Sequence, residues 1–263
     1  MDATGRWREI VRRPEADLPL DEAVVVLAAH ANEGLDVEAQ LRRLDDLAAR
    51  VDGTGTDGVC DLLFGTLALR GDRQTYDDPR NSYIDQVLDR RLGIPISLSV
   101  LLIEIGRRCG LEIEGVGMPG HFLARERRAP DVLIDSFDGG RRLDAAGCEE
   151  IFRVIAGSEA DFSPEMLRGT GSRAILARML TNLDRSYDRR IDRRALAWVT
   201  RLRMDLPGLT MQDRLDVARR AAGLGWHDRA ADIFEELADE PSLAGETASR
   251  LRRRSIRLRS SLN

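Results

Sequence analysis

The apolar segment between Ile94 and Ile105 is the feature that most restricts how this chain can fold. It follows Gly93-Ile94-Pro95, stays apolar on nearly every side until Arg107, and ends at Cys109-Gly110. Proline suits the first turn of a helix, and glycine suits the position just past its end. A helix without a polar face must be covered all round. The pattern therefore predicts a buried helix that opens at Gly93-Ile94-Pro95 and ends at Cys109-Gly110.

The segments around this helix predict the partners that cover it. Hydrophobic periodicity predicts further helices over residues 21–31, 37–51, 58–69, 83–92 and 144–156. Three short strand patterns lie at 112–116, 121–125 and 131–135, each with glycine or proline nearby, and their spacing is typical of hairpins. Turns are expected at 76–81 and 137–141. We predict an α+β fold, mainly helical, with a small antiparallel sheet.

The last third of the chain repeats a helical pattern. Two alanines about 35 residues apart are each followed by two bulky apolar residues and a proline: Ala195 by Val199, Leu202 and Pro207, and Ala230 by Phe234, Leu237 and Pro241. This period, with Gly225-Trp226 ahead of the second hairpin, resembles tetratricopeptide repeats, closed by a polar capping helix over 243–262. An unrelated helical bundle is the alternative. We expect one domain over residues 1–160 and a helical repeat region over 161–263.

Composition narrows the function classes. The 263 residues include 43% hydrophobic types and carry a net charge of −5, which argues against a general affinity for nucleic acid. No apolar run approaches the ~20 residues of a membrane span, and the amino terminus lacks an apolar signal region. The three cysteines are scattered, which favours neither disulfides nor a zinc site. We expect a cytoplasmic protein without a metal or another cofactor.

His121 is the histidine that the sequence best suits to chemistry. Of the three histidines, His30 ends a predicted helix and His227 lies in the repeat turn, so both are expected at the surface. His121 opens a predicted strand, and Asp135 lies on the next one. A carboxylate that accepts from one imidazole nitrogen fixes the tautomer and leaves the other nitrogen to act as a base. The sequence therefore predicts a His121–Asp135 pair, which could also simply stabilise the fold.

Four ordered blocks give the chain a family resemblance. They are Tyr76–Tyr83, Leu88–Ser99, Gly115–Leu123 and Ile134–Gly140. These blocks resemble the SirB-one family, whose amino-terminal region belongs to the transglutaminase-like superfamily and often precedes tetratricopeptide repeats. The resemblance implies a transglutaminase-like, papain-like core, with a helical lobe and a small sheet around a buried helix. It also implies the order of the site: the start of that helix, then histidine, then aspartate.

The chain departs from the active members of that superfamily at the nucleophile. Those enzymes open the buried helix with Gly-x-Cys, and the matching residues here are Gly93-Ile94-Pro95. Proline offers no nucleophile. Ser97, in the first helical turn, is a candidate substitute, although its hydroxyl can instead bond the backbone of that turn. Cys109 lies at the wrong end of the helix for a thiolate, so it is expected to be a buried or incidental cysteine. Cys60 and Cys148 lie outside the matching blocks, and structural roles are expected of them.

Other residues are candidates for binding rather than for catalysis. Asp78, Arg80 and Asn81 form a polar cluster beside a tyrosine, and they either line the cleft or cap a turn. Pro95 and Phe122 are expected to join them as binding residues. No metal-ligand spacing or nucleotide loop occurs; the glycines between 115 and 120 open a strand rather than a helix, and the proline among them removes a donor.

Two functions follow from these patterns. The first is a non-catalytic transglutaminase-like protein, a pseudoenzyme, whose repeats bind a protein or peptide partner. The alternative is a hydrolase or acyltransferase in which His121 is the base and Asp135 orients it. In that enzyme, Ser97 or an activated water would replace the missing thiol.

Overall fold

The fold is described from a computed structural model covering residues 2–241, 243 and 245–260. The chain divides into two compact units, residues 1–186 and 187–263. Helices of the first unit are α1 (Ala3–Arg12), α2 (Leu20–Ala31), α3 (Val37–Ala48), α4 (Gly55–Cys60), α5 (Ile84–Arg90), α6 (Pro95–Arg108), α7 (Ala145–Ala156) and most of α8 (Ser172–Arg189). Its strands are β1 (Arg70–Gly71), β2 (Leu92–Gly93), β3 (Ile113–Val116), β4 (Leu123–Glu126), β5 (Leu133–Asp135), β6 (Arg141–Leu143) and β7 (Gly169–Thr170).

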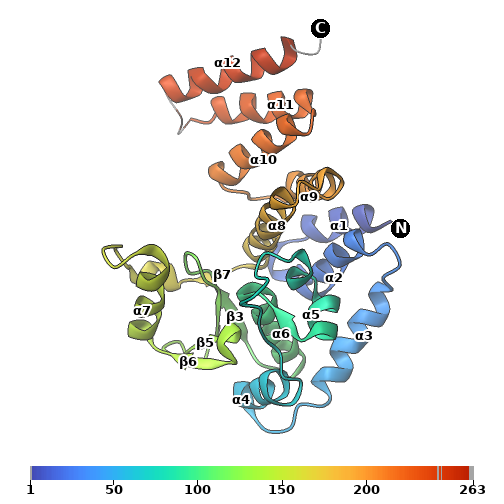
Figure 1. The fold of residues 1–263 in the computed structure, drawn as a ribbon, viewed down its shortest axis with the longest axis vertical. Coiled ribbons are helices and arrows are strands. Elements are labelled where there is room, and N and C mark those ends of the chain that lie inside the picture. The colour runs from blue at the N-terminus through green and yellow to red at the C-terminus, as the bar shows by residue number, and fades with distance from the viewer. Residues whose placement is uncertain (1, 242, 244, 261–263) are drawn as a thin grey trace. The chain divides into compact units, whose positions relative to one another are not determined.

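Helix α6 is the centre of the first unit (Figure 1). Every residue from Pro95 to Gly106 is buried, which confirms the predicted buried helix. It packs against β3 and β4 and against α3, α4 and α5. Its one buried carboxylate, Glu104, accepts hydrogen bonds from Arg107 and Arg108 in the following turn. The buried carboxylate of α6 is thus paired with arginines of the same helix, and the apolar residues of the helix form the core.

The sheet carries the second part of the site. Its five strands run in the order β6-β5-β4-β3-β7, and every neighbouring pair is antiparallel. Strands β3, β4 and β5 confirm the three predicted strands and their hairpin pairing. The prediction that His121 opens a strand is wrong by two residues. The His121 backbone N–H bonds to the carbonyl of Met118 in a turn, and pairing with β3 begins only at Leu123.

The remaining helices of the first unit agree with the sequence patterns apart from their ends. Helices α2, α3, α5 and α7 confirm four of the predicted helices. The helix expected over 58–69 begins earlier, at Gly55, and continues from α4 into a π-helical turn over Asp61–Thr66. The patterns did not predict α1, although it buries Trp7 completely. No helix of the described residues combines the length and the apolar character needed to cross a membrane.

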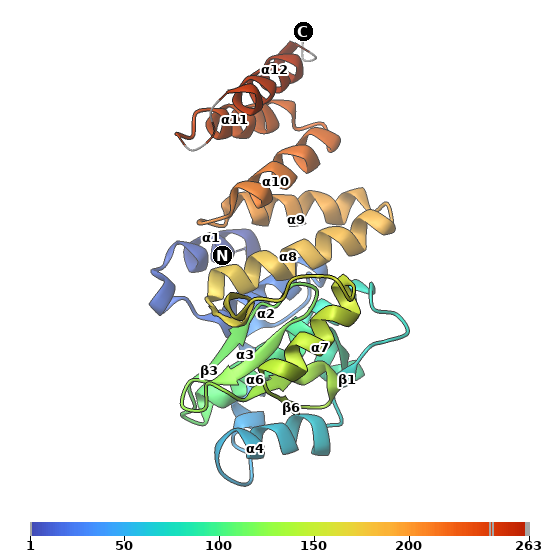
Figure 2. The ribbon, with the colours of Figure 1, turned by 90° about the vertical axis from the view of Figure 1, so that its left-hand side faces the viewer.

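The second unit consists of helices, shown at the carboxyl-terminal end of the chain in Figure 2. They are α9 (Arg193–Asp205), α10 (Met211–Gly223), α11 (His227–Ala238) and α12 (Glu246–Ser260). Ala195 and Ala230, the small residues of the repeat pattern, are both buried, as are the bulky residues one turn later, Val199 and Phe234. Helix α12 falls within the expected capping helix, whose last two positions, 261 and 262, lie outside the described residues.

The two units meet at a different place from the boundary expected at 160/161. The segment after residue 160 still belongs to the first unit, because β7 pairs with β3 and α8 buries its apolar face there. Ile175, Met179 and Leu183 on that face are all inaccessible or nearly so. The expected boundary at 160/161 therefore falls in the loop between α7 and the short helix Pro164–Leu167.

Candidate functional site

His121 and Asp135 form a buried, hydrogen-bonded pair. The Nε2 atom of His121 lies 2.9 Å from Oδ2 of Asp135. His121 is 8% exposed and Asp135 4% exposed, so water competes little for this bond. The turn before β4 positions the imidazole, and the last residue of β5 supplies the carboxylate. The structure thus brings together the two residues that the sequence singled out.

Asp135 holds the imidazole in one orientation. Its other oxygen, Oδ1, accepts the backbone N–H groups of Phe137 at 3.0 Å and Asp138 at 3.3 Å, capping the short helical turn that follows β5. With both oxygens engaged, the carboxylate accepts the Nε2 proton of neutral His121. The Nδ1 atom of His121 makes no hydrogen bond to any described residue. Nδ1 is therefore the nitrogen that could accept a proton.

Aromatic and apolar side chains border the imidazole. The Phe137 ring meets it edge-on, with centroids 6.3 Å apart, and the Tyr76 ring lies 5.9 Å from that of Phe137. Phe137 occupies the space beside Gly71 so closely that a Cβ at Gly71 would collide with its ring. On the other side, Gly120 packs directly against Ile155 of α7. Tyr76 and Ile155 are both exposed, and Arg73 lies over the Phe137 ring, 5.0 Å from its centroid, so apolar and charged groups reach the surface near His121.

Arg178 of α8 holds the loop that carries His121, and no sequence pattern points to this residue. Its Nη2 atom donates to the carbonyl oxygens of Met118 at 3.0 Å and His121 at 2.6 Å. Its guanidinium also lies over the Phe122 ring, 5.5 Å from the centroid. Burial lowers the pKa of Arg178. No motif distinguishes this arginine from the others among the forty basic residues, so only the fold could reveal it.

The amino-terminal turn of α6 begins at Pro95. Ser97, two residues further on, is completely buried and turned into the backbone. Its Oγ donates toward the carbonyls of Asn81 at 2.6 Å and Ile94 at 3.1 Å, and it accepts the N–H of Ile94 at 3.1 Å. Within the described residues, no hydrogen bond joins Ser97 to His121. Through these bonds Ser97 caps the start of α6.

Pro95, not Ser97, shares a helix face with Ser99, which contacts Ser136 beside the pair. Ser99 Oγ donates to Ser136 Oγ at 3.2 Å, and Ser136 directly follows Asp135. Residues four apart share one face of a helix, so Pro95 lies on the face of Ser99, one turn closer to the start. The helix therefore presents a proline ring where the resemblance places a nucleophile. The backbone of Gly93 lies close to the side chain of Ser97. A Cβ at Gly93 would lie only 2.9 Å from Ser97 Oγ, so glycine is the residue that fits there.

Asp78 and Arg80 are placed in a turn. Asp78 accepts the backbone N–H of Arg80 at 2.9 Å and caps the short helix Pro79–Ser82. The Arg80 guanidinium returns to the same carboxylate, with Nη2 2.6 Å from Oδ2. Both groups are engaged with each other, and of the two roles left open by the sequence, this geometry favours the capping of a turn.

Asn81 connects that turn to the start of α6. Its Nδ2 donates to Oδ2 of Asp72 at 3.0 Å and to the Thr75 carbonyl at 2.8 Å, while its Oδ1 accepts from Arg90 at 2.9 Å. Its backbone carbonyl receives the Ser97 hydroxyl. Asp72, which no sequence motif marks, is thus the buried centre of a network that fixes the loop against the helix.

The remaining candidates lie away from the pair. Phe122 is 1% exposed and packs against Gly115 and Arg178, which gives it a place in the core. Cys148 is buried in the cluster around Phe152, and burial raises the pKa of its thiol to about 11. Burial also raises the pKa of the Cys60 and Cys109 thiols.

In the part of the chain that the structure describes, no hydrogen bond joins a cysteine sulfur to His121. Among those residues, no group of three or more histidine, cysteine or acidic side chains is placed to hold a metal ion.

The first unit thus combines a mostly helical core around a buried central helix with a small antiparallel sheet and a histidine–aspartate pair. The family model of the transglutaminase-like superfamily matches residues 31–181, more than half of the chain, and the chain belongs to this superfamily. The match covers α6, the pair and the part of α8 that carries Arg178. It therefore includes the segment beyond residue 160 that the fold assigns to the first unit.

Similar proteins are bacterial and mammalian. A UPF0162 protein of Xylella fastidiosa is 45% identical over 129 residues, which are 48% of this chain and 46% of that protein. A UPF0162 protein of Pseudomonas aeruginosa is 30% identical over 172 residues, 62% of this chain and 63% of its own length. F-box only protein 21 of Mus musculus is 35% identical over 102 residues, 35% of this chain and 16% of that protein. The match to the first of these relatives spans about half its length. No solved structure matches.

Proposed function

We propose that the chain is a non-catalytic member of the transglutaminase-like superfamily, of the SirB-one type, that acts by binding a protein or peptide. In this proposal the first unit keeps the framework of an acyl-transfer enzyme without its nucleophile. The helices of the second unit form a tetratricopeptide-like surface for the partner. The protein works in the cytoplasm, where its thiols stay reduced.

The start of α6 is the observation that carries the proposal. Pro95 lies one turn before Ser99, the residue of this helix face that contacts Ser136, and proline has neither a thiol nor a hydroxyl to activate. The nearest hydroxyl in that turn, on Ser97, already donates to a backbone carbonyl and accepts a backbone N–H. Cys148, buried and with a pKa near 11, stays protonated at neutral pH. Of Pro95, Ser97 and Cys148, none therefore offers His121 a nucleophile to deprotonate.

The hydrolase alternative has one observation in its favour. Nδ1 of His121 has no hydrogen-bond partner among the described residues, and such a nitrogen could accept a proton from water. Water attack on an amide would still need donors for the oxyanion. The backbone donors at the start of α6 are reduced by one because Pro95 lacks an N–H.

The experiment compares turnover by the wild-type protein, His121→Ala and Asp135→Asn. Each is incubated with a panel of glutamine-containing peptides, with an amine acceptor or with water alone, and products are counted by mass spectrometry. We expect all three proteins to give the same background. Circular dichroism establishes that the variants are folded. Turnover that falls in both folded variants would overturn the non-catalytic proposal in favour of the hydrolase or acyltransferase.

A further inference from the structure

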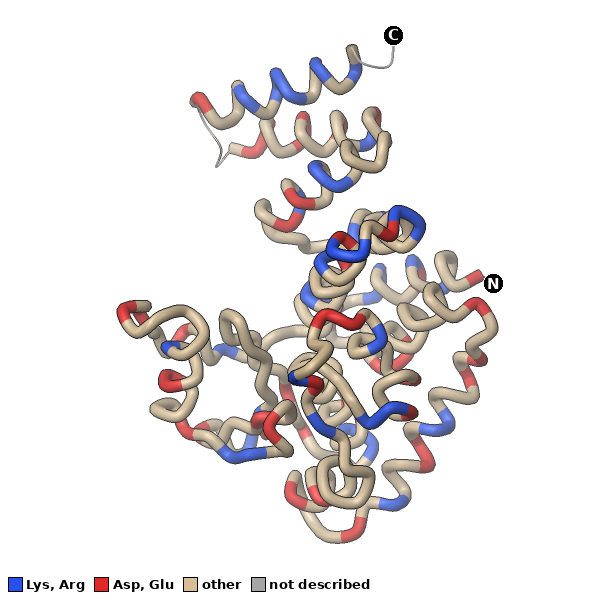
Figure 3. The backbone as a smooth tube through the Cα atoms, in the orientation of Figure 1, with Lys and Arg blue, Asp and Glu red and all other residues tan. Residues whose placement is uncertain are grey.

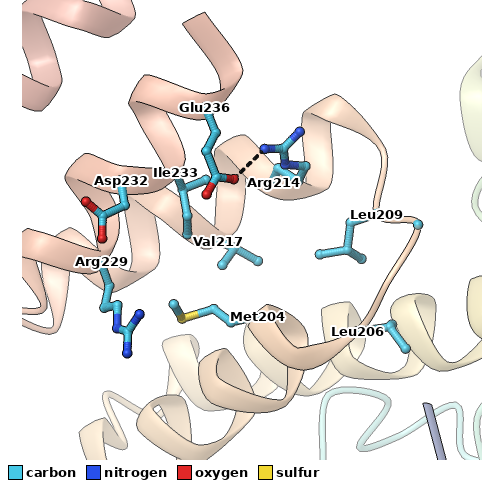
Figure 4. A pocket seen from close by; sticks show the side chains of 10 residues that line it. Met204, Leu206, Leu209, Arg214, Val217, Arg229, Asp232, Ile233 and Glu236 are labelled. Carbon is cyan, nitrogen blue, oxygen red and sulfur yellow. Dashed lines mark hydrogen bonds and ion pairs between the residues drawn. The ribbon is translucent and has the colours of Figure 1, made fainter. Parts of the chain in front are cut away.

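The second unit contains a cavity of about 560 Å³ that none of the residues discussed so far lines. It lies where the end of α9, the loop after it, α10 and α11 come together (Figure 4). Its volume is in the range of pockets that accept small ligands or side chains. The lining residues are Met204, Leu206, Gly208, Leu209, Arg214, Val217, Arg229, Asp232, Ile233 and Glu236. All of them belong to the second unit.

The cavity offers an apolar surface that is only partly covered. Leu206 and Val217 are buried, whereas Met204, Leu209 and Ile233 are half-buried. An apolar side chain entering from outside would remove the uncovered part of these three from water, which is favourable in proportion to the area covered. The cavity therefore suits an aliphatic group.

Most charges around the cavity are already matched. Arg214 pairs with Glu236 at 2.9 Å and also with Glu240, and Asp232 pairs with Arg259 of α12 at 3.0 Å. The same division is visible along the helices: Figure 3 shows mainly acidic residues on α11 and mainly arginines on α12. These pairs neutralise the acidic rim from within the unit.

Arg229 is different from these paired groups. It is exposed, and it makes no hydrogen bond or ion pair with any described residue. Figure 4 shows its guanidinium on the side of Met204, away from the carboxylate of Asp232. A planar guanidinium binds a carboxylate through two parallel hydrogen bonds. An unmatched cation thus stands beside the apolar floor of the cavity.

We propose that this cavity binds a peptide segment that places a leucine- or methionine-sized side chain on the apolar floor and an aspartate or glutamate carboxylate on Arg229. The proposal rests on the proposed function, since it takes the second unit as the binding part, and it adds the chemistry of the partner. A carboxylate suits the site better than a phosphate. With the other rim charges paired, Arg229 supplies one positive charge, which a single carboxylate balances and a phosphate dianion exceeds.

The test uses the full chain with ¹³C-methyl methionine, so that the Met204 methyl signal reports on the cavity. Met204→Leu assigns that signal. The probes are amidated decapeptides of alanine and glutamine that contain one leucine and one glutamate, spaced one to four residues apart. Matched peptides carry a second glutamine in place of the glutamate. We expect the glutamate peptide of the fitting spacing to shift the Met204 signal and to bind about tenfold more tightly than its glutamine counterpart.

Variants separate the role of Arg229 from that of general positive charge. Arg229→Gln should abolish the preference for glutamate, and Arg229→Lys should keep part of it. The matched control is Arg253→Gln, which removes an exposed arginine of α12 that is likewise unpaired among the described residues. This control should bind as the wild type does.

Three results would overturn the proposal: no shift of the Met204 signal at millimolar peptide, an unchanged glutamate preference in Arg229→Gln, or tighter binding of the matching phosphoserine peptide. None of them concerns turnover, so they leave the non-catalytic proposal standing. Conversely, turnover that depends on His121 would refute that proposal without altering the peptide result.

Discussion

Ser97 and Pro95 lie on different faces of the first turn of α6. The hydroxyl of Ser97 faces the backbone of the preceding loop, and the ring of Pro95 lies on the face of Ser99, which contacts Ser136 next to Asp135. A helix start that must deliver a nucleophile needs a reactive side chain on the second of these faces. In this chain, the reactive group lies on the wrong face and the inert one on the right face.

Replacing Ser97 with alanine should therefore affect stability rather than chemistry. The change leaves the buried carbonyl of Asn81 without this donor and the N–H of Ile94 without this acceptor. We expect Ser97→Ala to lower the free energy of unfolding by about 1–3 kcal/mol in urea titrations. The exposed control Ser158→Ala should change it by less than about 0.5 kcal/mol. Unchanged stability in Ser97→Ala would show that these bonds are not formed.

The tautomer of His121 is a second property fixed by single residues. Because Asp135 accepts at Nε2, the proton of neutral His121 should reside on Nε2 and not on Nδ1. Nitrogen-15 spectra of the imidazole should show this, and Asp135→Ala should shift the ring toward a mixture of tautomers. His30 and His227 provide internal reference signals, since neither contacts Asp135. A wild-type His121 protonated on Nδ1 would contradict the hydrogen bond as described.

At the scale of elements, the loop from Asp72 to Asn81 is held to α6 by one buried carboxylate. Burial acts to raise the pKa of Asp72, but hydrogen bonds from Thr75, Asn81 and the Gln74 N–H outweigh it and lower that pKa. The folded protein thus prefers the ionised carboxylate. This contribution to stability is complete above the ordinary aspartate pKa of about 3.9 and is lost as the pH falls through the lower value of the folded state.

Asp72→Asn tests that linkage. At pH 7 we expect a lower melting temperature than in the wild type, because a neutral amide offers Asn81 and Thr75 a weaker acceptor. The difference should shrink as the pH is lowered from 5 to 2.5, where the wild type loses its own ionised carboxylate. The control, Asp131→Asn, changes an exposed carboxylate and should track the wild type throughout. A difference that stays constant with pH would refute the linkage.

The sequence predicted the elements with local hydrophobic patterns but not those that depend on long-range contacts. The apolar run of α6 and the hairpin spacing of β3 to β5 are local signals, and both predicted the fold correctly. Strand β7 has only two residues, and its pairing with β3 depends on the long connection through α7. Arg178 of α8 likewise bonds to the His121 loop although the two are far apart in the sequence. Contacts between segments that are distant in the sequence produce no local hydrophobic pattern, so the sequence could not predict them.

At the scale of the whole molecule, the chain contains two compact units with separate cores. Phe234 in the core of the second unit is 1% exposed and packs with Ala218, Ala221 and Ala230. Phe234→Ala should destabilise that unit by about 3–5 kcal/mol. We expect the His227 signal of the second unit to be lost at a lower temperature in this variant, with the His30 and His121 signals unchanged.

The mirror-image variant is Leu101→Ala, which opens the core around α6 in the first unit. It should lower the temperature at which the His30 and His121 signals are lost and leave that of His227 in place. Loss of all three signals at one temperature in both variants would instead mean that the whole chain unfolds as a single cooperative unit.

The most direct test of the central claim, that Pro95 stands where a nucleophile would be activated, is the alkylation rate of the thiol in Pro95→Cys. Iodoacetamide labelling at pH 6, resolved by residue in a mass spectrometer, is compared with that in Pro95→Cys/His121→Ala. If the pair is intact and only the nucleophile is missing, the new thiol reacts at least tenfold faster than exposed Cys109, and the advantage disappears without His121. A thiol that reacts at the same ordinary rate with and without His121 would contradict the account.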